Sequence, residues 1–269
     1  MVKKLFKHEF HAYGRVMSII YIILLTVAVA TRVIMSFESD TTAYEIVSSL
    51  TLVTYCVSIF AAIGFSFVMA IIRFYKNLFT SEGYLTFTLP VTSGQHIMVK
   101  AVTAVCVDFI TVLVVLISAL IVIPGEILTE IWNSLGKTIS LLYEVAGIHS
   151  VFFGVELFII ILAASFSGIM LYYTFISIGQ LFKKNRILAA VGAYFVYYII
   201  SQIASTILTI SFSVFAESYL LADMMFWISE HPYESIHIFM CGGIILSTIF
   251  VLIEYFVIHF IISKKLNLE

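Results

Sequence analysis

Residues 97–123 read IMVKAVTAVCVDFITVLVVLISALIVI, and only Lys100 and Asp108 in this run are charged. An α-helix of this length extends about 40 Å, at ~1.5 Å per residue. The hydrocarbon core of a bilayer is about 30 Å thick and is crossed by about 20 mostly apolar residues. The run therefore predicts a membrane-spanning helix.

Five other runs share this length and apolar character, and the whole composition agrees with them. Of the 269 residues, 62% are hydrophobic and 11% are charged, with a mean hydropathy of +1.11. Soluble domains are about 45–50% apolar and about 25% charged. We therefore predict an all-α integral membrane protein, a single transmembrane domain over residues 1–269. The five other runs are near 16–35, 46–72, 151–178, 187–210 and 238–262. The run at 16–35 follows a basic N-terminus and is interpreted as a signal anchor.

Basic residues are unevenly distributed between the segments that join these six spans. If both termini lie on one side, twelve of the 14 lysine and arginine residues fall on that side. The opposite segments are mostly acidic. Because lysine and arginine are enriched on the cytoplasmic side, both termini are predicted to be cytoplasmic. Five or seven spans would put one basic cluster on the wrong side.

Three of the joining segments predict helices that do not cross the membrane. Residues 1–15 read as a basic amphipathic helix on the inner surface, with Lys4, Lys7, Phe10 and Arg15 as its interfacial residues; an ordinary charged anchor is the alternative. Residues 124–150 and 211–237 lie outside in this topology. Their apolar and aromatic residues predict short interfacial or re-entrant helices.

The sequence contains partial matches to motifs for phosphate and metal binding, but the spacing of their residues differs from the spacing that these motifs require. Gly136-Lys137-Thr138 resembles the end of a phosphate-binding loop, but Ile131 stands where the first glycine is required. His8 and His11 are three residues apart, whereas the metalloprotease helix needs four. The three cysteines show no paired spacing. We therefore expect no enzyme activity and no metal site in this chain.

Ionisable residues within or near the spans are candidates for function, because charges at such depths are costly. Asp108 falls about 16 Å into the third span, close to mid-bilayer. Two interpretations stay open for each residue: a translocation path or coupling site, and structural pairing with a neighbouring helix. The four candidates are Asp108, Glu254, Arg32 and Glu156.

The segment 73–100 between the second and third spans is longer than a connection requires. Thr80 or Ser81 can cap a short helix, and Pro90 disfavours helix before it. Thr92 and Gln95 form a capping box that predicts a fresh helix start. The apolar residues before Pro90 indicate a helix or a strand that docks in a groove of another protein. The alternative is that they lie in the membrane interface.

This segment resembles the inner loop of permease subunits of bacterial type-2 ATP-binding-cassette (ABC) transporters. The N-terminal LFKHEFHAYGRV, with Glu9-Phe10 and Gly14-Arg15, is also similar to the interfacial helix of that family. The motif similarity covers about forty residues, whereas the architecture of six spans covers the chain. The loop residues that carry the similarity or belong to the implied coupling surface are Phe79, Glu82, Gly83, Tyr84, Leu85, Thr86, Phe87, Leu89, Pro90, Val91 and Lys100.

The resemblance implies a coupling helix that docks onto a separate cytoplasmic ATPase subunit, which binds ATP and magnesium. It implies two permease copies, identical or different, in a bacterial plasma membrane, with lipid and no nucleic acid as further partners. Export of a hydrophobic or amphipathic substrate, such as an antimicrobial peptide, lipid or drug, is expected. The alternative is a stand-alone ion-coupled carrier, or a membrane-bound immunity or assembly factor, that uses Asp108 and Glu254.

Overall fold

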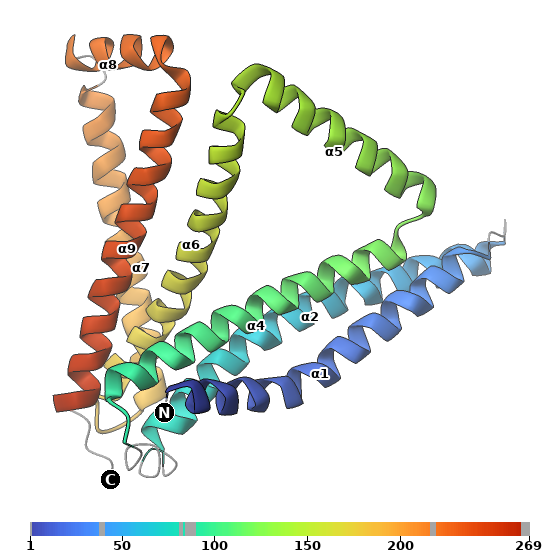
Figure 1. Cartoon of the computed structure of the whole chain (residues 1–269). Coiled ribbons are helices and arrows are strands. Elements are labelled where there is room, and N and C mark those ends of the chain that lie inside the picture. Colours follow the sequence, from blue (N-terminus) through green and yellow to red (C-terminus); the bar gives the residue numbers. More distant parts are fainter. Residues whose placement is uncertain (1, 38–40, 81–82, 84–89, 216–218, 265–269) are drawn as a thin grey trace. The chain divides into compact units, whose positions relative to one another are not determined.

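The structure, a computed structural model, describes residues 2–37, 41–80, 83, 90–215 and 219–264. Every regular element within these residues is a helix (Figure 1). Six of the helices are long and apolar enough to cross a membrane. The prediction of an all-helical chain with six candidate spans is therefore confirmed.

Five of the six long helices begin and end within seven residues of the predicted limits and extend past most of them. The first begins at Val2 rather than near Val16, so the predicted interfacial segment 1–15 is the start of one continuous helix and not a separate element. A helix of 38 residues is about 57 Å long, so it projects well beyond a hydrocarbon core of about 30 Å. The candidate spans are α1 (Val2–Met35), α2 (Thr42–Phe79), α4 (Ser93–Val122), α6 (His149–Gly179), α7 (Arg186–Phe215) and α9 (Pro232–Lys264); α5 (Gly125–Ala146) and α8 (Tyr219–Glu230) are shorter.

The chain divides into two compact units, Met1–Leu141 and Leu142–Glu269. In the first unit α1, α2 and α4 all pack against one another. Buried residues of α1 recur at intervals of three, four or seven positions, the spacings of one helical face. They build two apolar clusters: Tyr13 and Met17 with Val107, and Leu24 and Ala28 with Tyr55, Ala62 and Val122.

Polar side chains also meet between the helices of the first unit. The hydroxyl groups of Tyr21 and Thr111 lie 2.7 Å apart, and those of Tyr55 and Ser118 lie 3.0 Å apart. Hydrocarbon offers no water to satisfy such groups. Each pair therefore joins α4 to a specific neighbour and helps to fix the register of the helices.

The segment 73–100 contains the ends of two helices rather than one long loop. Helix α2 continues past the predicted Ile72 as far as Phe79. Helix α4 begins at Ser93, and the predicted capping box is present. The Thr92 hydroxyl accepts from Gln95 N at 3.3 Å, and Gln95 Oε1 accepts from Thr92 N at 3.2 Å. Only residues 80–92 lie between the two long helices.

In the second unit α6 packs against both α7 and α9. The Phe175 ring contacts the rings of Tyr194 and Tyr197 on α7, with centroid distances of 5.7 and 5.4 Å. At the corner between α6 and α7, a Cβ on Gly179 would lie 2.6 Å from Arg186 O and 2.8 Å from Ala190 Cβ. Glycine therefore allows the close approach of α7 to the end of α6.

The two shorter helices occupy the segments predicted to remain outside the spans. Helix α5 is a single element, exposed along nearly its whole length, with its apolar residues gathered on one side. It ends before Gly147, whose φ of 54° is in the left-handed region that glycine favours. Helix α8 lies across the ends of α7 and α9 (Figure 1).

Candidate functional site

A cluster of charged and amide side chains, two of them buried and two partly exposed, joins α1, α2 and α4 at one end of the first unit. The Glu9 carboxylate accepts from Lys100 Nζ at 2.7 Å, from Arg73 Nη2 at 2.7 Å and Nε at 3.2 Å, and from Asn77 Nδ2 at 3.1 Å. Glu9 and Lys100 are each 3% exposed. We call Glu9, Arg73, Asn77 and Lys100 the Glu9 cluster.

The cluster is well matched in its hydrogen bonds. Both Glu9 oxygens are used, and the Arg73 guanidinium, which gives Glu9 Oε2 two donors, also lies 5.0 Å from the centre of the Tyr13 ring. Cations favour the face of an aromatic ring. Removal of one partner from a buried pair typically costs about 3–5 kcal/mol. Glu9 is the only anion among the four side chains and pairs with both cations.

The cluster connects the N-terminal helix to both boundaries of residues 80–92. Arg73 and Asn77 stand on the last two turns of α2, and Lys100 stands on the second turn of α4. Their shared partner, Glu9, is on α1. The cluster therefore joins three of the candidate membrane helices close to the connecting segment.

The connecting segment itself is described only in part. Phe79 is 5% exposed and packs edge-on against Phe74, with ring centres 5.7 Å apart. Gly83 N donates to Thr80 O at 2.8 Å, and Pro90 is exposed. The other predicted coupling residues lie outside the described residues: Glu82, Tyr84, Leu85, Phe87 and Leu89.

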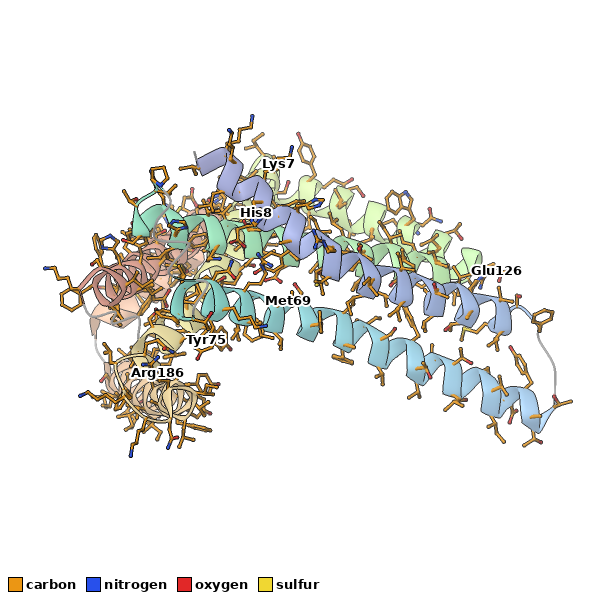
Figure 2. The ribbon with its side chains drawn as sticks, turned by 90° about the horizontal axis from the view of Figure 1, so that it is seen from below. Lys7, His8, Met69, Tyr75, Glu126 and Arg186 are labelled. Carbon is orange, nitrogen blue, oxygen red and sulfur yellow. The ribbon has the colours of Figure 1, made fainter. Side chains whose placement is uncertain are left out.

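The predicted interfacial residues of α1 are exposed. Lys4, Lys7 and Arg15 are exposed, and Phe10, 37% exposed, stacks on Phe6 with ring centres 6.0 Å apart. Lys7 lies on the outer side of α1 in Figure 2. The first turns of α1 thus present cations outward and Glu9 inward.

Two of the predicted intramembrane carboxylates occupy different surroundings. Asp108 on α4 accepts a short hydrogen bond from the Ser66 hydroxyl of α2. Glu254 on α9 is 8% exposed, and its Oε2 has no hydrogen-bond partner among the described residues. Asp108 therefore has a structural partner across a helix pair, whereas half of the Glu254 carboxyl is unsatisfied.

The third carboxylate, Glu156, belongs to a chain of side chains between α6 and α9. His237 Nδ1 lies 2.8 and 2.9 Å from the two Glu156 oxygens, and His237 Nε2 lies 3.0 Å from His149 Nδ1. The ring of Tyr233 stacks on His149, and its hydroxyl donates to Val145 O at 2.6 Å. An ionised carboxylate only accepts, so the Nδ1 of His237 carries a proton when Glu156 is ionised.

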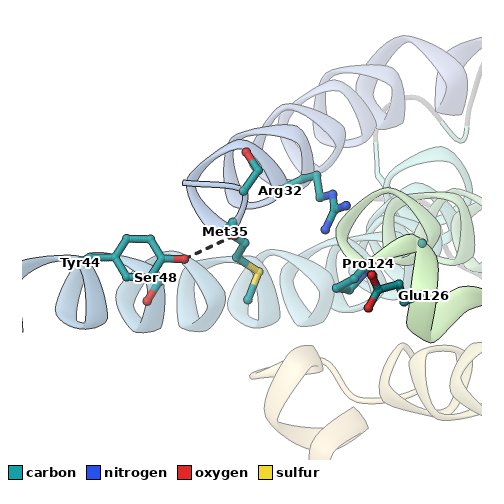
Figure 3. A pocket seen from close by; sticks show the side chains of 8 residues that line it. Arg32, Met35, Tyr44, Ser48, Pro124 and Glu126 are labelled. Atoms are coloured by element: carbon teal, nitrogen blue, oxygen red, sulfur yellow. Dashed lines mark hydrogen bonds between the residues drawn. The ribbon is translucent and has the colours of Figure 1, made fainter. Parts of the chain in front are cut away.

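The last candidate, Arg32, lines a pocket at the end of the first unit away from the Glu9 cluster. The pocket holds about 540 Å³, and Glu126 of α5 also lines it (Figure 3). The Arg32 side chain forms no ion pair or hydrogen bond with any residue that the structure describes. Arg32 and Asp108, both in the first unit, thus occupy different surroundings.

Several of these contacts were not predicted from the sequence. Glu9 was noted only for its resemblance to a family motif, and Asn77, Ser66, His149 and His237 were not among the predicted site residues. Opposite charges at the same ends of predicted spans were a usable signal for Glu9 and Lys100. The way the helices are arranged around one another determines which side chains are in contact. No single stretch of sequence predicts that arrangement.

Comparisons with protein-family models, with curated proteins and with solved structures found no match to this chain. Within the described residues, no three His, Cys, Asp or Glu side chains are grouped so that they could hold a metal ion. The function is therefore inferred from the contacts described above and from the sequence.

Proposed function

We propose that the chain is the permease subunit of an ABC transporter, driven by a separate cytoplasmic ATPase subunit that binds ATP and magnesium. The observation that carries the proposal is the Glu9 cluster. A coupling segment must be firmly connected to the helices that it moves. Residues 80–92 lie between α2 and α4, and both helices are bonded to Glu9 of α1 close to this segment.

The proposed mechanism follows from this connection. Closure of two ATPase subunits displaces the segment around Tyr84 and Leu85. The displacement passes to α2 through Arg73 and Asn77, to α4 through Lys100, and to α1 through Glu9. Packed helices and rigid networks transmit such shifts because they have few alternative arrangements.

The proposed surroundings are a bacterial plasma membrane with both chain termini in the cytoplasm. The basic residues of the inner segments support this orientation. Six candidate spans amount to half of a transport pathway, so a second permease copy, identical or different, is proposed. The apolar spans favour export of a hydrophobic or amphipathic substrate.

The test is association with the ATPase subunit. We expect Tyr84→Asp or Leu85→Asp to lower co-purification of the ATPase at least ten-fold, because a charge replaces an apolar docking residue. Tyr143→Asp on the exposed α5 is the matched control. Thermal unfolding should be unchanged in all three variants. ATPase association that is equal in all three would refute the proposed docking.

A second candidate is an ion-coupled carrier, and the unsatisfied Oε2 of the buried Glu254 favours it. Asp108→Asn keeps an oxygen that can accept from Ser66. The permease proposal therefore expects transport by Asp108→Asn at near the wild-type rate. A carrier that moves protons on Asp108 or Glu254 would lose gradient-driven transport in Asp108→Asn or Glu254→Gln, without any need for ATP.

A further inference from the structure

The pocket that contains Arg32 brings opposite charges to one small space. Arg32 comes from the last turn of α1, and Glu126 comes from the first turn of α5. No ion pair joins them. A pocket of about 540 Å³ is within the range of about 300–1,000 Å³ that small-molecule sites occupy.

The pocket also offers neutral hydrogen-bonding groups. The Tyr44 hydroxyl, which donates to Met35 O at 3.3 Å, and Ser48 line it from α2 (Figure 3). Pro124 precedes the first turn of α5, and its carbonyl accepts from Leu128 N at 2.9 Å. The N–H groups ahead of Leu128 have no partner within the helix, and they give that helix end a partial positive charge.

If α1 and α4 span a bilayer as the sequence predicts, the pocket lies at the level of the membrane interface. It lies where the apolar run of α1 stops at Met35 and that of α4 stops at Ile123. The amphipathic α5 starts there. At this level, just outside the hydrocarbon core, a bilayer presents the phosphate groups of its lipids and the amines that some headgroups carry.

We propose that this pocket binds a phosphoethanolamine group. Its phosphate pairs with the Arg32 guanidinium and the first N–H groups of α5, and its ammonium pairs with the Glu126 carboxylate. Arginine is suited to phosphate because its planar donors bind two oxygens at once. The group comes either from a phospholipid of the adjoining leaflet or from a soluble phosphoethanolamine compound. The proposal is independent of any ATPase partner.

The test is titration of the purified full chain with short-chain phosphatidylethanolamine, short-chain phosphatidylglycerol and free phosphoethanolamine, followed by calorimetry. Arg32→Gln should weaken phosphatidylethanolamine binding at least ten-fold. Arg32→Lys, which keeps the charge and loses the planar fork, should weaken it two- to five-fold. Glu126→Gln should weaken phosphatidylethanolamine at least five-fold and leave phosphatidylglycerol unchanged or tighter, because only the former carries the ammonium.

Glu130→Gln and Lys137→Gln, both exposed on α5 and outside the pocket, are matched controls and should bind as the wild type does. Free phosphoethanolamine that binds as tightly as the lipid identifies a soluble source, and at least ten-fold weaker binding identifies the lipid. Unchanged affinity in Arg32→Gln, or equal effects of Glu126→Gln on both lipids, would overturn the proposal. The Glu126→Gln comparison stands alone if Arg32→Gln does not fold.

Discussion

Glu9 illustrates how one side chain acquires a role through residues far away in sequence. The sequence places it in a basic, amphipathic stretch, where a carboxylate on a solvated helix would be unremarkable. The structure surrounds it with Lys100 and Arg73, 91 and 64 residues away. Glu9 and Lys100 are almost fully buried, so their ionic contact replaces the water that would otherwise solvate both charges.

Glu9→Gln should lower the stability of the protein sharply, by about 3–5 kcal/mol if the cost is that of a broken buried pair. The amide removes the negative charge and leaves Arg73 and Lys100 facing each other. Thermal unfolding of the detergent-solubilised protein measures the effect. Lys100→Met should be milder, because Glu9 retains Arg73.

Glu45→Gln is the control for that experiment, since Glu45 is an exposed carboxylate near the start of α2. It should unfold at the wild-type temperature. Equal unfolding temperatures for Glu9→Gln and Glu45→Gln would mean that the Glu9 cluster contributes nothing to stability.

At the scale of helices, the corner between α6 and α7 depends on the absence of a side chain. Arg186 O and Ala190 Cβ both occupy the space that a Cβ on Gly179 would need. Asn185, with a φ of 54°, leads directly into α7. Asparagine tolerates this conformation better than most residues. The corner is thus built by two residues whose backbone or size permits it.

Gly179→Ala should therefore destabilise the second unit by about 1–3 kcal/mol, the usual cost of forcing an extra methyl group into a packed site. Gly154→Ala and Gly168→Ala, also on α6, are the matched controls because a Cβ there meets nothing within 4 Å. Chemical unfolding in detergent compares the three. A Gly179→Ala protein as stable as the controls would contradict the close approach of the two helices.

The existence of the helices was largely predictable, because the apolar runs and the Thr92 capping box are local signals. Several helix ends could not be predicted from the apolar runs. Helix α2 continues to Phe79. Burial of Phe74 and Leu78 stabilises the helical conformation of these last two turns, which also contain polar residues. The apolar run that predicts the span ends at Ile72 because Arg73 and Lys76 are charged. Both residues are nevertheless compatible with a helix.

At the scale of the whole molecule, the sequence predicts an orientation that can be measured directly. Basic segments on one side and acidic segments on the other imply cytoplasmic termini. The pairings Glu9–Lys100 and Glu156–His237 required the three-dimensional arrangement, since neither pair shares a helix. The candidate site was therefore less predictable than the spans.

Cysteine labelling should reveal the orientation. In a background without Cys56, Cys106 and Cys241, Lys137→Cys should react with a membrane-impermeant thiol reagent in intact cells. Lys183→Cys should react only after permeabilisation. Both positions are exposed, so access depends on the side of the membrane. Labelling of Lys183→Cys in intact cells, with Lys137→Cys protected, would invert the topology.

The Glu9 cluster also sets an order of assembly during synthesis. Glu9 leaves the ribosome 91 residues ahead of Lys100, a delay of roughly 5–18 s at 5–20 residues per second. Glu9 can therefore contact Arg73 only after α2 has been made, and Lys100 only after the start of α4 has followed. The first helix to be synthesised must wait for two later ones before its buried carboxylate has all its partners.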